Sequence, residues 1–279
     1  MCRILEVSPS AFYAWRTRPL CAHHQRDEQL RHKIEQVFHQ SRGRYGSPRV
    51  YQELRAQGEV CSKKRVARLM RQCKLTVKAK RGFVSTTDST HACAVAPNVL
   101  NRRFDVEQVE TVNCAWAGDI TFIPTAKGWL YLAVVLDLKS RKVIGWSMAD
   151  TLEQSLVHEA LSLAVGQRLT SPTGEELLFH SDRGSQYAAH NYRDKLAQWE
   201  IVCSMSGKGN CWDNAPVESF FATLKKELVY REKYQTHEQA KASLFYYIEV
   251  FYNRQRRHSA LGYKSPHDYE QSLLINCPP

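Results

Sequence analysis

Apolar residues change their spacing near residue 113 of this chain. From that point, short runs rich in Val, Ile, Leu, Thr and aromatic residues are separated by polar turns, which is typical of β-strands. Three such runs, at 115–124, 129–138 and 142–148, are predicted to form a meander. A helical pattern follows at about 152–168. Its apolar face is predicted to contain Leu156, Ala160, Leu163 and Ala164.

Two more strand-like runs continue this half of the chain. A strand at 177–181 precedes a helix at 191–200, and a strand at 201–204 precedes a helix that carries Glu218. Strands and helices in this order, βββαβαβ and then a helix, predict an α/β fold. We expect a ribonuclease H-like, mixed five-stranded sheet with flanking helices.

The first third of the chain has a helical pattern throughout. Apolar residues recur at helical spacing in 26–40, 47–57 and 63–74. Two short helices joined by a turn at Gly58 match the outline of a helix-turn-helix, and a small basic helical bundle is the alternative. A further short helix is predicted within 1–20, although that stretch is too small to fold alone.

These patterns predict five segments. They are an N-terminal helical tail (1–20), a basic, all-helical, helix-turn-helix-like module (21–81), a polar linker (82–110), the α/β core (111–230), and a C-terminal helix with a basic tail (231–279).

Positive charge is concentrated in the helical module. The chain has a formal net charge of +11, and residues 41–81 alone carry 13 Lys or Arg against two Asp or Glu. Such a patch indicates a polyanionic partner, most simply DNA, whereas a solvated face is the alternative reading. The last helix is predicted to expose five basic side chains as candidate DNA contacts: Lys63, Lys64, Arg65, Arg68 and Arg71. Arg254 and Arg257 belong to a second basic cluster near the C-terminus.

Composition excludes several other classes of protein. The nine cysteines are odd in number and none forms a C-x-x-C pair, so a disulfide scaffold or a structural zinc site is not expected. No apolar run approaches the roughly 18–20 residues of a membrane span, and the N-terminus lacks a signal-peptide pattern. We therefore expect a cytoplasmic protein without a membrane partner.

Three carboxylates are the candidate chemistry. Asp119 is expected near an end of the first strand, Asp182 at the end of the fourth, and Glu218 on the helix after the fifth. Mg²⁺ prefers oxygen ligands, and two ions held by shared carboxylates can promote phosphoryl transfer. Singly, each acid has a commoner structural role in a turn, a cap or a solvated face. Together with the basic module, the three are predicted to form a metal site.

Other polar residues near these acids have simpler interpretations. Asp137 is expected at a strand–turn junction, while Asp213 or Asn214 is expected to cap the helix of Glu218. His180, two residues before Asp182, could support the metal-binding acids or pack within its strand, and packing is the expected role.

Six motifs carry a resemblance to a known family. They are YGSPR at 45–49, WAGDIT at 116–121, HSDRGSQY at 180–187, DNAPVESFF at 213–221, YN at 252–253 and RHSALGY at 257–263. In these residues the chain resembles OrfB-type transposases of bacterial insertion sequences, whose catalytic core is similar to that of retroviral integrases.

The resemblance implies a DDE polynucleotidyl transferase. Asp119, Asp182 and Glu218 would be its catalytic, metal-binding acids, with two Mg²⁺ or Mn²⁺ ions as cofactors, and Lys225 would contact DNA. The reaction would be strand cleavage at element ends followed by strand transfer into target DNA. The implied partners are both DNAs, further copies of the chain, and an upstream-frame product fused by frameshifting.

Two other functions remain open at this stage. One is a non-catalytic, DNA-binding regulator of the element, which the basic module alone would support. The other is a structure-selective nuclease on the same fold, which would cut DNA without joining it.

Overall fold

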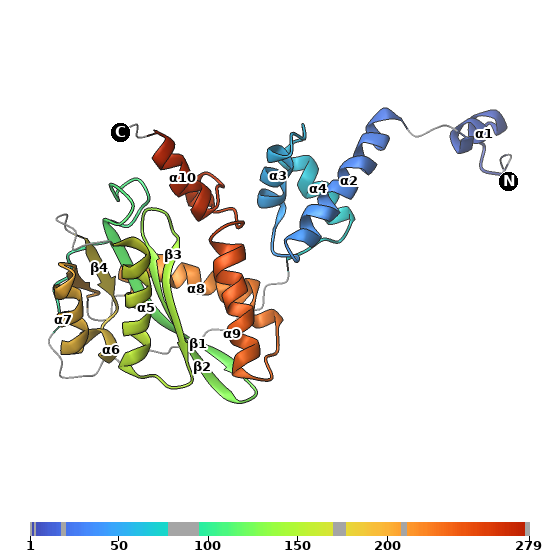
Figure 1. Cartoon of the computed structure of the whole chain (residues 1–279). Coiled ribbons are helices and arrows are strands. Elements are labelled where there is room, and N and C mark those ends of the chain that lie inside the picture. The colour runs from blue at the N-terminus through green and yellow to red at the C-terminus, as the bar shows by residue number, and fades with distance from the viewer. Residues whose placement is uncertain are drawn as a thin grey trace. The chain divides into compact units, whose positions relative to one another are not determined.

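The computed structural model describes residues 2, 4–17, 21–77, 95–169, 177–207 and 211–276. The chain divides into two compact units, Met1–Lys78 and Ala79–Pro279, and each is described by itself (Figure 1). None of the helices in the described residues has both the length and the hydrophobicity that a bilayer crossing needs.

The first unit is all helical, as predicted. Its helices are α1 (Pro9–Thr17), α2 (Ala22–Gln40), α3 (Ser47–Ala56) and α4 (Lys63–Gln72). Helix α4 begins at Ser62, whose side chain accepts a hydrogen bond from the backbone N–H of Arg65, and α3 has a proline in its first turn. The apolar faces of α2, α3 and α4 form one core, with Ile34, Leu54 and Leu69 fully buried.

The second unit contains the predicted mixed five-stranded sheet. Its strands are β1 (Ala115–Thr125), β2 (Gly128–Asp137), β3 (Val143–Ala149), β4 (Leu178–Ser181) and β5 (Val202–Met205). They lie in the order β3-β2-β1-β4-β5 (Figure 1). The β1–β2 and β2–β3 pairs are antiparallel, whereas β4 pairs parallel with both β1 and β5.

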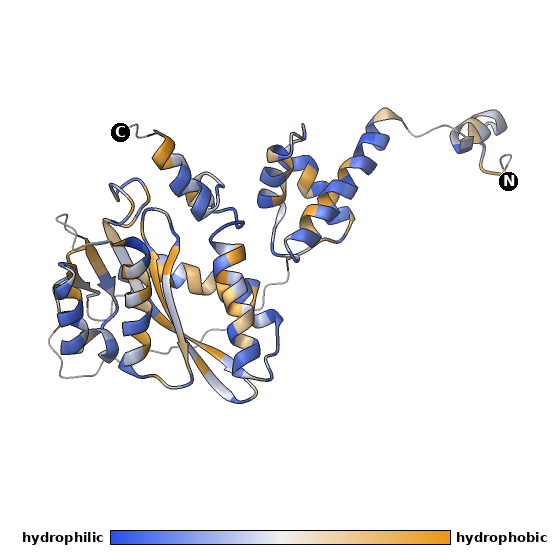
Figure 2. Cartoon of the chain, in the orientation of Figure 1, coloured by the Kyte–Doolittle hydropathy of each residue, from blue (hydrophilic) through white to orange (hydrophobic). Residues whose placement is uncertain are grey.

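Helices cover both faces of this sheet. Helix α5 (Gln154–Arg168) packs on β2 and β3, where Gly145 lacks a Cβ that would collide with the backbone of Ala160. The next residue, Trp146, contacts Phe245 on the opposite face, because neighbouring strand residues alternate between faces. Strands and the sheet-facing sides of the helices are the most hydrophobic parts of the unit (Figure 2).

The predicted apolar face of α5 needs one correction. Leu156, Ala160 and Ala164 are buried as predicted, but Leu163 is 36% exposed. The buried face widens instead toward Leu161 and its helical neighbours Val157 and Val165, because residues four apart lie on one side of a helix.

Shorter elements complete the unit. They are α6 (Ser185–Ala188), α7 (His190–Gln198), the 3₁₀ segments η1 (Cys211–Asn214), η2 (Val229–Arg231) and η4 (Ser259–Leu261), α8 (Ala215–Glu227), α9 (His237–Phe245) and α10 (Pro266–Asn276). After Phe245 the helix of α9 continues as a π-helical segment, η3 (Tyr246–Tyr252). Just beyond it, the Asn253 side chain accepts from the N–H of Val143 at 3.0 Å and donates to its C=O at 2.9 Å. These two bonds hold this end of the helix against the edge strand β3.

The predicted linker is also only partly correct. Its first part, and the boundary at 81/82, lie outside the described residues. Residues 95–113, which we call the strap, are irregular but packed on the core: Leu100 and Val109 are buried. Lys139 donates to the C=O groups of Val106 and Val109, so the strap is fixed to the β2–β3 turn as well.

Candidate active site

Asp119 and Asp182 lie next to each other on neighbouring parallel strands. In the β1–β4 register Gly118 is opposite Ser181, and each acid is the residue that follows. Neighbouring strands are about 4.8 Å apart, so the two backbones hold these acids at adjacent positions. Asp119 was predicted near an end of its strand. It lies instead in the middle of β1, beside the point where β4 ends.

Local hydrogen bonds orient both carboxylates. The N–H of Ile120 donates to Asp119 Oδ1 at 2.7 Å, and the N–H of Gly184 donates to Asp182 Oδ1 at 2.9 Å. A Cβ at position 184 would lie 3.0 Å from that same Asp182 oxygen. Glycine at 184 therefore leaves room for the carboxylate to turn back onto its own loop.

The third acid, Glu218, is brought toward β1 by the beginning of its helix. Asn214, the residue before α8, donates from Nδ2 to the C=O of Gly118 at 3.1 Å. Glu218 follows Asn214 by four residues and therefore lies on the same side of the helix. The contact of α8 with β1 places this side next to Asp119, and the Glu218 side chain reaches the surface.

The three carboxyl groups influence one another electrostatically. Burial raises the pKa of Asp119 well above its ordinary value of 3.8, and the charges of Asp182 and Glu218 raise it further. Partial burial and the charge of Asp182 also raise the pKa of Glu218. The pKa of Lys225 is lowered by burial and raised in part by Asp119, so this lysine lies near the same group.

The carboxylates form a cluster but not a closed ligand shell. Within the described ranges, no three His, Cys, Asp or Glu side chains are gathered closely enough to hold a metal ion together. The donor set itself consists of carboxylate oxygens, which suits Mg²⁺ or Mn²⁺. Like charges that raise a neighbour's pKa are stabilised by a cation placed among them.

The floor of this site contains residues to which the sequence had assigned no role. A Cβ on Gly118 would lie 2.6 Å from the ring of Phe179 and 3.4 Å from that of Tyr187, so both rings pack under β1 beside Asp119. Burial raises the pKa of Tyr187 well above its ordinary value, and Tyr192, Asp119 and Asp182 add to this. Phe179 and Tyr187 lie beside or within the HSDRGSQY motif, and this position was the only signal for Tyr187 in the sequence.

The other polar candidates have structural roles. Asp137 is fully buried and accepts hydrogen bonds from the N–H groups of Asn113, Lys139 and Ser140, which fits a strand–turn junction. His180 is fully buried between the hydroxyls of two serines, and burial lowers its pKa to about 4.

The expected cap of α8 is correct in position, since Asn214 is its N-cap residue, but not in hydrogen bonding. Neither Asp213 nor Asn214 gives α8 a side-chain capping bond. Asn214 instead reaches β1, and Asp213 accepts from Asn98, Arg102 and Gly207. Both side chains therefore connect the beginning of α8 to other segments instead of capping the helix.

The candidate DNA contacts on α4 divide into two groups. Lys63, Lys64 and Arg71 are exposed, as predicted. Arg65 is only 21% exposed and donates to Asp27 Oδ1 at 2.7 Å, while Arg68 donates to Oδ2 of the same carboxylate at 2.8 Å. The prediction that Arg65 is exposed was wrong, because both arginines hold α4 against α2.

The C-terminal basic cluster divides in the same way. Arg254 is exposed, and Arg257 is half-buried and donates to the C=O of Tyr263 at 3.1 Å. Arg256 is 4% exposed and forms a buried ion pair with Glu227 at 2.9 Å. Arg256 therefore stabilises the core rather than contributing to a basic surface.

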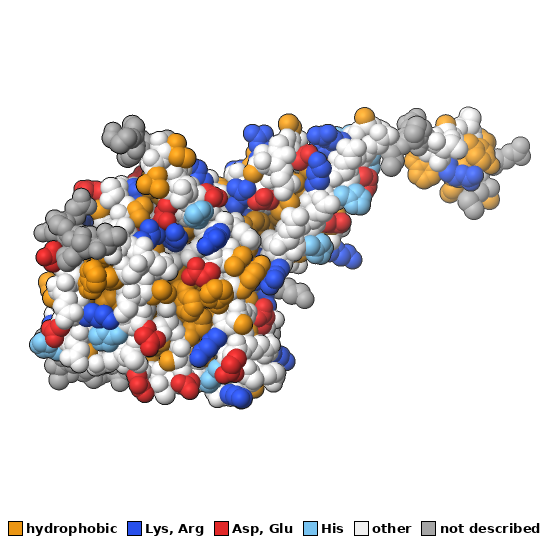
Figure 3. Space-filling view, in the orientation of Figure 1, with side chains coloured by type: hydrophobic (Ala, Val, Ile, Leu, Met, Phe, Trp, Pro, Cys, Tyr) orange, Lys and Arg blue, Asp and Glu red, His pale blue; other side chains and the backbone are white. Residues whose placement is uncertain are grey.

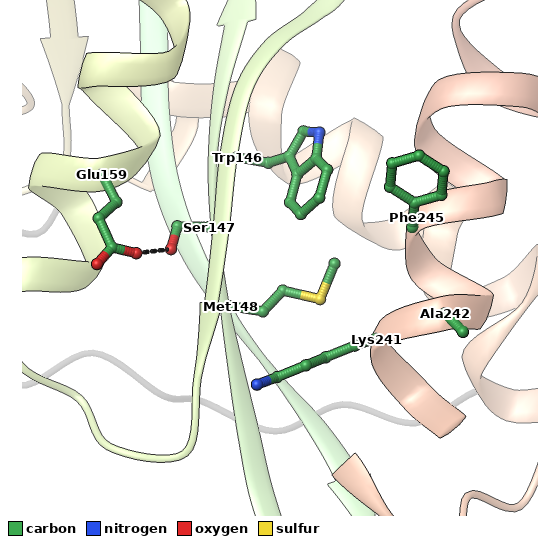
Figure 4. Close-up of a pocket in the computed structure, with 7 residues that line it drawn as sticks. All are labelled: Trp146, Ser147, Met148, Glu159, Lys241, Ala242 and Phe245. Atoms are coloured by element: carbon green, nitrogen blue, oxygen red, sulfur yellow. Dashed lines mark hydrogen bonds between the residues drawn. The ribbon is translucent and has the colours of Figure 1, made fainter. Parts of the chain in front are cut away.

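A separate hollow lies at the β3 edge of the sheet. It has a volume of 470 Å³ and is lined by Trp146, Ser147, Met148, Glu159, Lys241, Ala242 and Phe245. Trp146 and Met148 point toward α9, while Ser147 donates to Glu159 on α5 (Figure 4). Apolar side chains gather over the same region of the surface (Figure 3). Strands β1 and β4 carry the acids, so this hollow is distinct from the carboxylate cluster.

Family models match both units of the chain. Residues 25–83 match a model described as an HTH-like domain, while 110–211 and 200–266 match two models described as an integrase core domain. The first match contains α2, α3 and α4, and the other two contain all three carboxylates.

Known proteins resemble the chain over nearly its whole length. It is 41% identical over 277 residues to the transposase InsF for insertion sequence IS3A of Escherichia coli (strain K12), covering 98% of this chain and 94% of that protein. It is 40% identical over 266 residues to an uncharacterized 31 kDa protein of insertion element IS600 from Shigella sonnei, covering 95% and 96%.

Solved structures with a related backbone include viral integrases. A chain of the simian T-cell lymphotropic virus intasome matches with a TM-score of 0.49 and 14% identity, covering 88% of this chain and 76% of that one. The catalytic core domain of BIV integrase matches with a TM-score of 0.43 and 20% identity, covering 59% and 98%. By its full-length relatives and its integrase core, the chain belongs to the family of insertion-sequence transposases.

Proposed function

We propose that Asp119, Asp182 and Glu218 are the catalytic and metal-binding acids of this transposase. The chain would then be a DDE polynucleotidyl transferase that cuts DNA at the ends of its insertion sequence and joins them to a target. The carrying observation is the pairing of Gly118 with Ser181, which sets two acids side by side within range of the charge on Glu218.

The proposed cofactors are two Mg²⁺ or Mn²⁺ ions. Asp119, Asp182 and Glu218 would hold them, since their oxygen donors suit these ions and their mutual repulsion raises the pKa of Asp119. When bound, such ions supply Lewis-acid stabilisation to the attacking and leaving oxygens of phosphoryl transfer.

The proposed reaction consists of two displacements at phosphorus. Water first cleaves a phosphodiester at the element end, and the freed 3′-hydroxyl then attacks a phosphodiester of the target. In both steps the chain orients the reacting groups rather than forming a covalent bond to them. Lys225, whose charge interacts with Asp119, would pair with a DNA phosphate near the reacting one.

DNA contacts outside the active site are proposed for both units. On α4, the exposed Lys63, Lys64 and Arg71 would contact phosphates directly. Arg68, which is 43% exposed, and Arg65 would add their charge while they remain bonded to Asp27. The other proposed contacts are Arg254 and Arg257.

Several broader features also remain proposals. Two DNA ends must be handled together, which favours a homo-oligomer assembled on DNA, and frameshift fusion to an upstream product would add further DNA binding. An enzyme acting on chromosomal DNA of a bacterium would work in the cytoplasm. The five-segment division is kept, except that 95–110 is assigned to the core.

Substitution of Asp182 tests the proposal. The substrate is duplex DNA with the terminal inverted repeats of the encoding element, incubated with Mg²⁺ or EDTA. We expect Asp182→Asn to bind this DNA as well as the wild type but to lose both nicking and joining. The control is Asp150→Asn, an exposed acid that follows β3, which should retain both. Strand transfer by purified Asp182→Asn would contradict the assignment.

The same assay separates the two alternatives. A non-catalytic regulator would bind end DNA without nicking it, and EDTA would change nothing. A structure-selective nuclease would nick the DNA without joining it. Neither alternative is better supported than transposition by the relatives of the chain.

A further inference from the structure

One buried carboxylate joins three segments beside the proposed active site. Asp213 is 2% exposed, and its Oδ1 accepts from Arg102 Nε at 2.8 Å. Its Oδ2 accepts from Asn98 Nδ2 at 3.0 Å and from the N–H of Gly207 at 2.8 Å. The strap, the loop after β5 and the beginning of α8 therefore meet at this single group.

The part of the strap that contains Asn98 and Arg102 is fixed by further contacts. The N–H groups of Val99 and Leu100 donate to the hydroxyl of Ser204 on β5, at 3.0 and 3.1 Å. Asn101 and Arg102 have φ values of 45° and 59°, a left-handed conformation that is costly for residues other than glycine. Such strain persists only where surrounding contacts fix it, and here it directs Arg102 to Asp213.

The next residue carries the connection from Asp213 into the active site. Asn214 is 3% exposed and donates to the C=O of Gly118, the residue before Asp119. Its Oδ1 is buried and has no hydrogen-bond partner among the described residues. Glu218 lies one turn further along α8. A shift of the Asp213 joint would therefore move Asn214 and Glu218 together relative to β1.

We propose that the strap positions the Glu218-bearing helix through Asp213, with Arg102 and Asn98 as positioning residues for the proposed reaction. This inference rests on the proposed role of Glu218. It also implies that the functional core begins near residue 95, before the integrase core match at 110.

The test compares two neighbouring arginines of the strap in the full chain. Arg102→Ala removes the charged donor to Asp213, whereas Arg103→Ala removes the same charge from an exposed position in the same turn. We expect Arg102→Ala to raise the Mg²⁺ concentration for half-maximal nicking about tenfold, because Glu218 would be held less firmly and loss of a group that orients a metal ligand typically weakens metal binding by that much. Arg103→Ala should remain within about twofold of the wild type, with the same DNA affinity as Arg102→Ala, because each loses one phosphate-attracting charge.

Hydrogen exchange gives a second readout that does not depend on activity. Arg102→Ala should speed amide exchange at the beginning of α8 and in 97–104, while β1 and β2 stay protected. Arg102→Lys, which keeps a charged donor, should restore both the exchange pattern and most of the Mg²⁺ response. If Arg102→Ala fails to fold, Asn98→Ala, which removes one neutral donor, serves in its place.

The possible outcomes have distinct meanings. Equal Mg²⁺ responses of the Arg102→Ala and Arg103→Ala variants would overturn the positioning role, even if exchange at α8 increased. Unchanged exchange at α8 would overturn it as well. Nicking by the wild type that needs no divalent cation would instead contradict the proposed function, and the exchange experiment would still report on the strap.

Discussion

Two carboxylates, one in each unit, have opposite surroundings. Asp27, in the helical unit, is 4% exposed and is bonded to two arginines, with the hydrogen bond from Arg68 as the main reason that its pKa falls to about 2. Asp119, in the core, has its pKa raised by burial and by two other acids. The charge of Asp27 is neutralised within the chain, whereas the charges around Asp119 repel one another and would be stabilised by a cation.

This contrast is the one we expect between a structural acid and a catalytic one. An acid whose neighbours neutralise it contributes to folding, as Asp27 does by joining α2 to α4. Acids that repel one another destabilise the folded state. Such an arrangement is usually retained only where binding or catalysis uses the site. The basic side chains of α4 differ in the same way. Arg65 forms an ion pair with Asp27, whereas Arg71 is exposed to solvent.

The largest expected effect is a loss of catalysis without a loss of stability. Asp119→Asn removes a metal ligand and should lower DNA nicking roughly 10³-fold or more. It also removes a repelled, partly buried charge, so the free energy of unfolding without divalent cations should rise. Nicking rates and thermal unfolding in EDTA measure the two effects. A destabilised Asp119→Asn variant would mean that this carboxylate is structural.

The opposite result is expected for Asp27. Asp27→Ala leaves two arginines facing an apolar position and should cost about 2 kcal/mol of stability in the helical unit. This is less than for a fully buried pair, since Arg68 is 43% exposed and water can reach it. Hydrogen exchange of α2 and α4 measures the loss. The control is Glu28→Ala, which breaks an exposed pair with Arg31 and should cost less than about 1 kcal/mol.

Lowering the pH should change the contributions of the two carboxylates to folding stability in opposite directions. The folded-state pKa of Asp27 is about 2, below its unfolded value, so its contribution is present above about pH 4 and is lost as pH falls toward 2. The folded-state pKa of Asp119 is raised, so the core is favoured below about pH 4 and loses stability as pH rises through that pKa.

The stability difference between the wild type and each variant measures the contribution of the substituted carboxylate. The stability difference between the wild type and Asp119→Asn, measured in EDTA, should shrink as pH falls from 7 to 4. The difference between the wild type and Asp27→Ala should stay constant over that range and shrink only below it. Parallel curves for the two variants would refute the contrast.

The smallest effect concerns the exposed arginine of α4. Arg71→Ala should weaken DNA binding a few-fold and lower the salt dependence, as a slope of log affinity, by about one unit. Its folding should be unchanged. Arg65→Ala should weaken binding similarly but also destabilise the helical unit, because Asp27 loses a donor. Equal stabilities of the two variants would show that Arg65 is not committed to folding.

Much of the fold was predictable because it follows from local periodicity. The strands at 115–125, 128–137 and 143–149 match the predicted runs closely, and so do α3 and α4. The π-helical segment after Phe245 was not predicted. The segment ends just before Asn253, whose side chain bonds to Val143 of β3, and periodicity carries no information on such a tertiary contact.

The sequence could propose the three acids but not their surroundings. Their placement near predicted strands and the family motifs suggested them, and the β1–β4 register sets Asp119 and Asp182 side by side. No pattern in the chain indicates that Asp213 faces Arg102, which lies 111 residues earlier. The sequence also could not show which arginines of α4 are used within the fold, because Arg65 and Arg71 belong to the same charge pattern.

Thermal unfolding of the full chain with increasing Mg²⁺ or Mn²⁺ tests most directly whether the three acids form one cation site. A ligand that binds only the folded state stabilises it according to its concentration relative to Kd. We predict that the core of the wild type unfolds at higher temperature as either ion is added. Asp119→Asn combined with Asp182→Asn should remove that response, and Asp150→Asn should keep it. An equal rise in the double variant, or no rise in the wild type, would contradict the account.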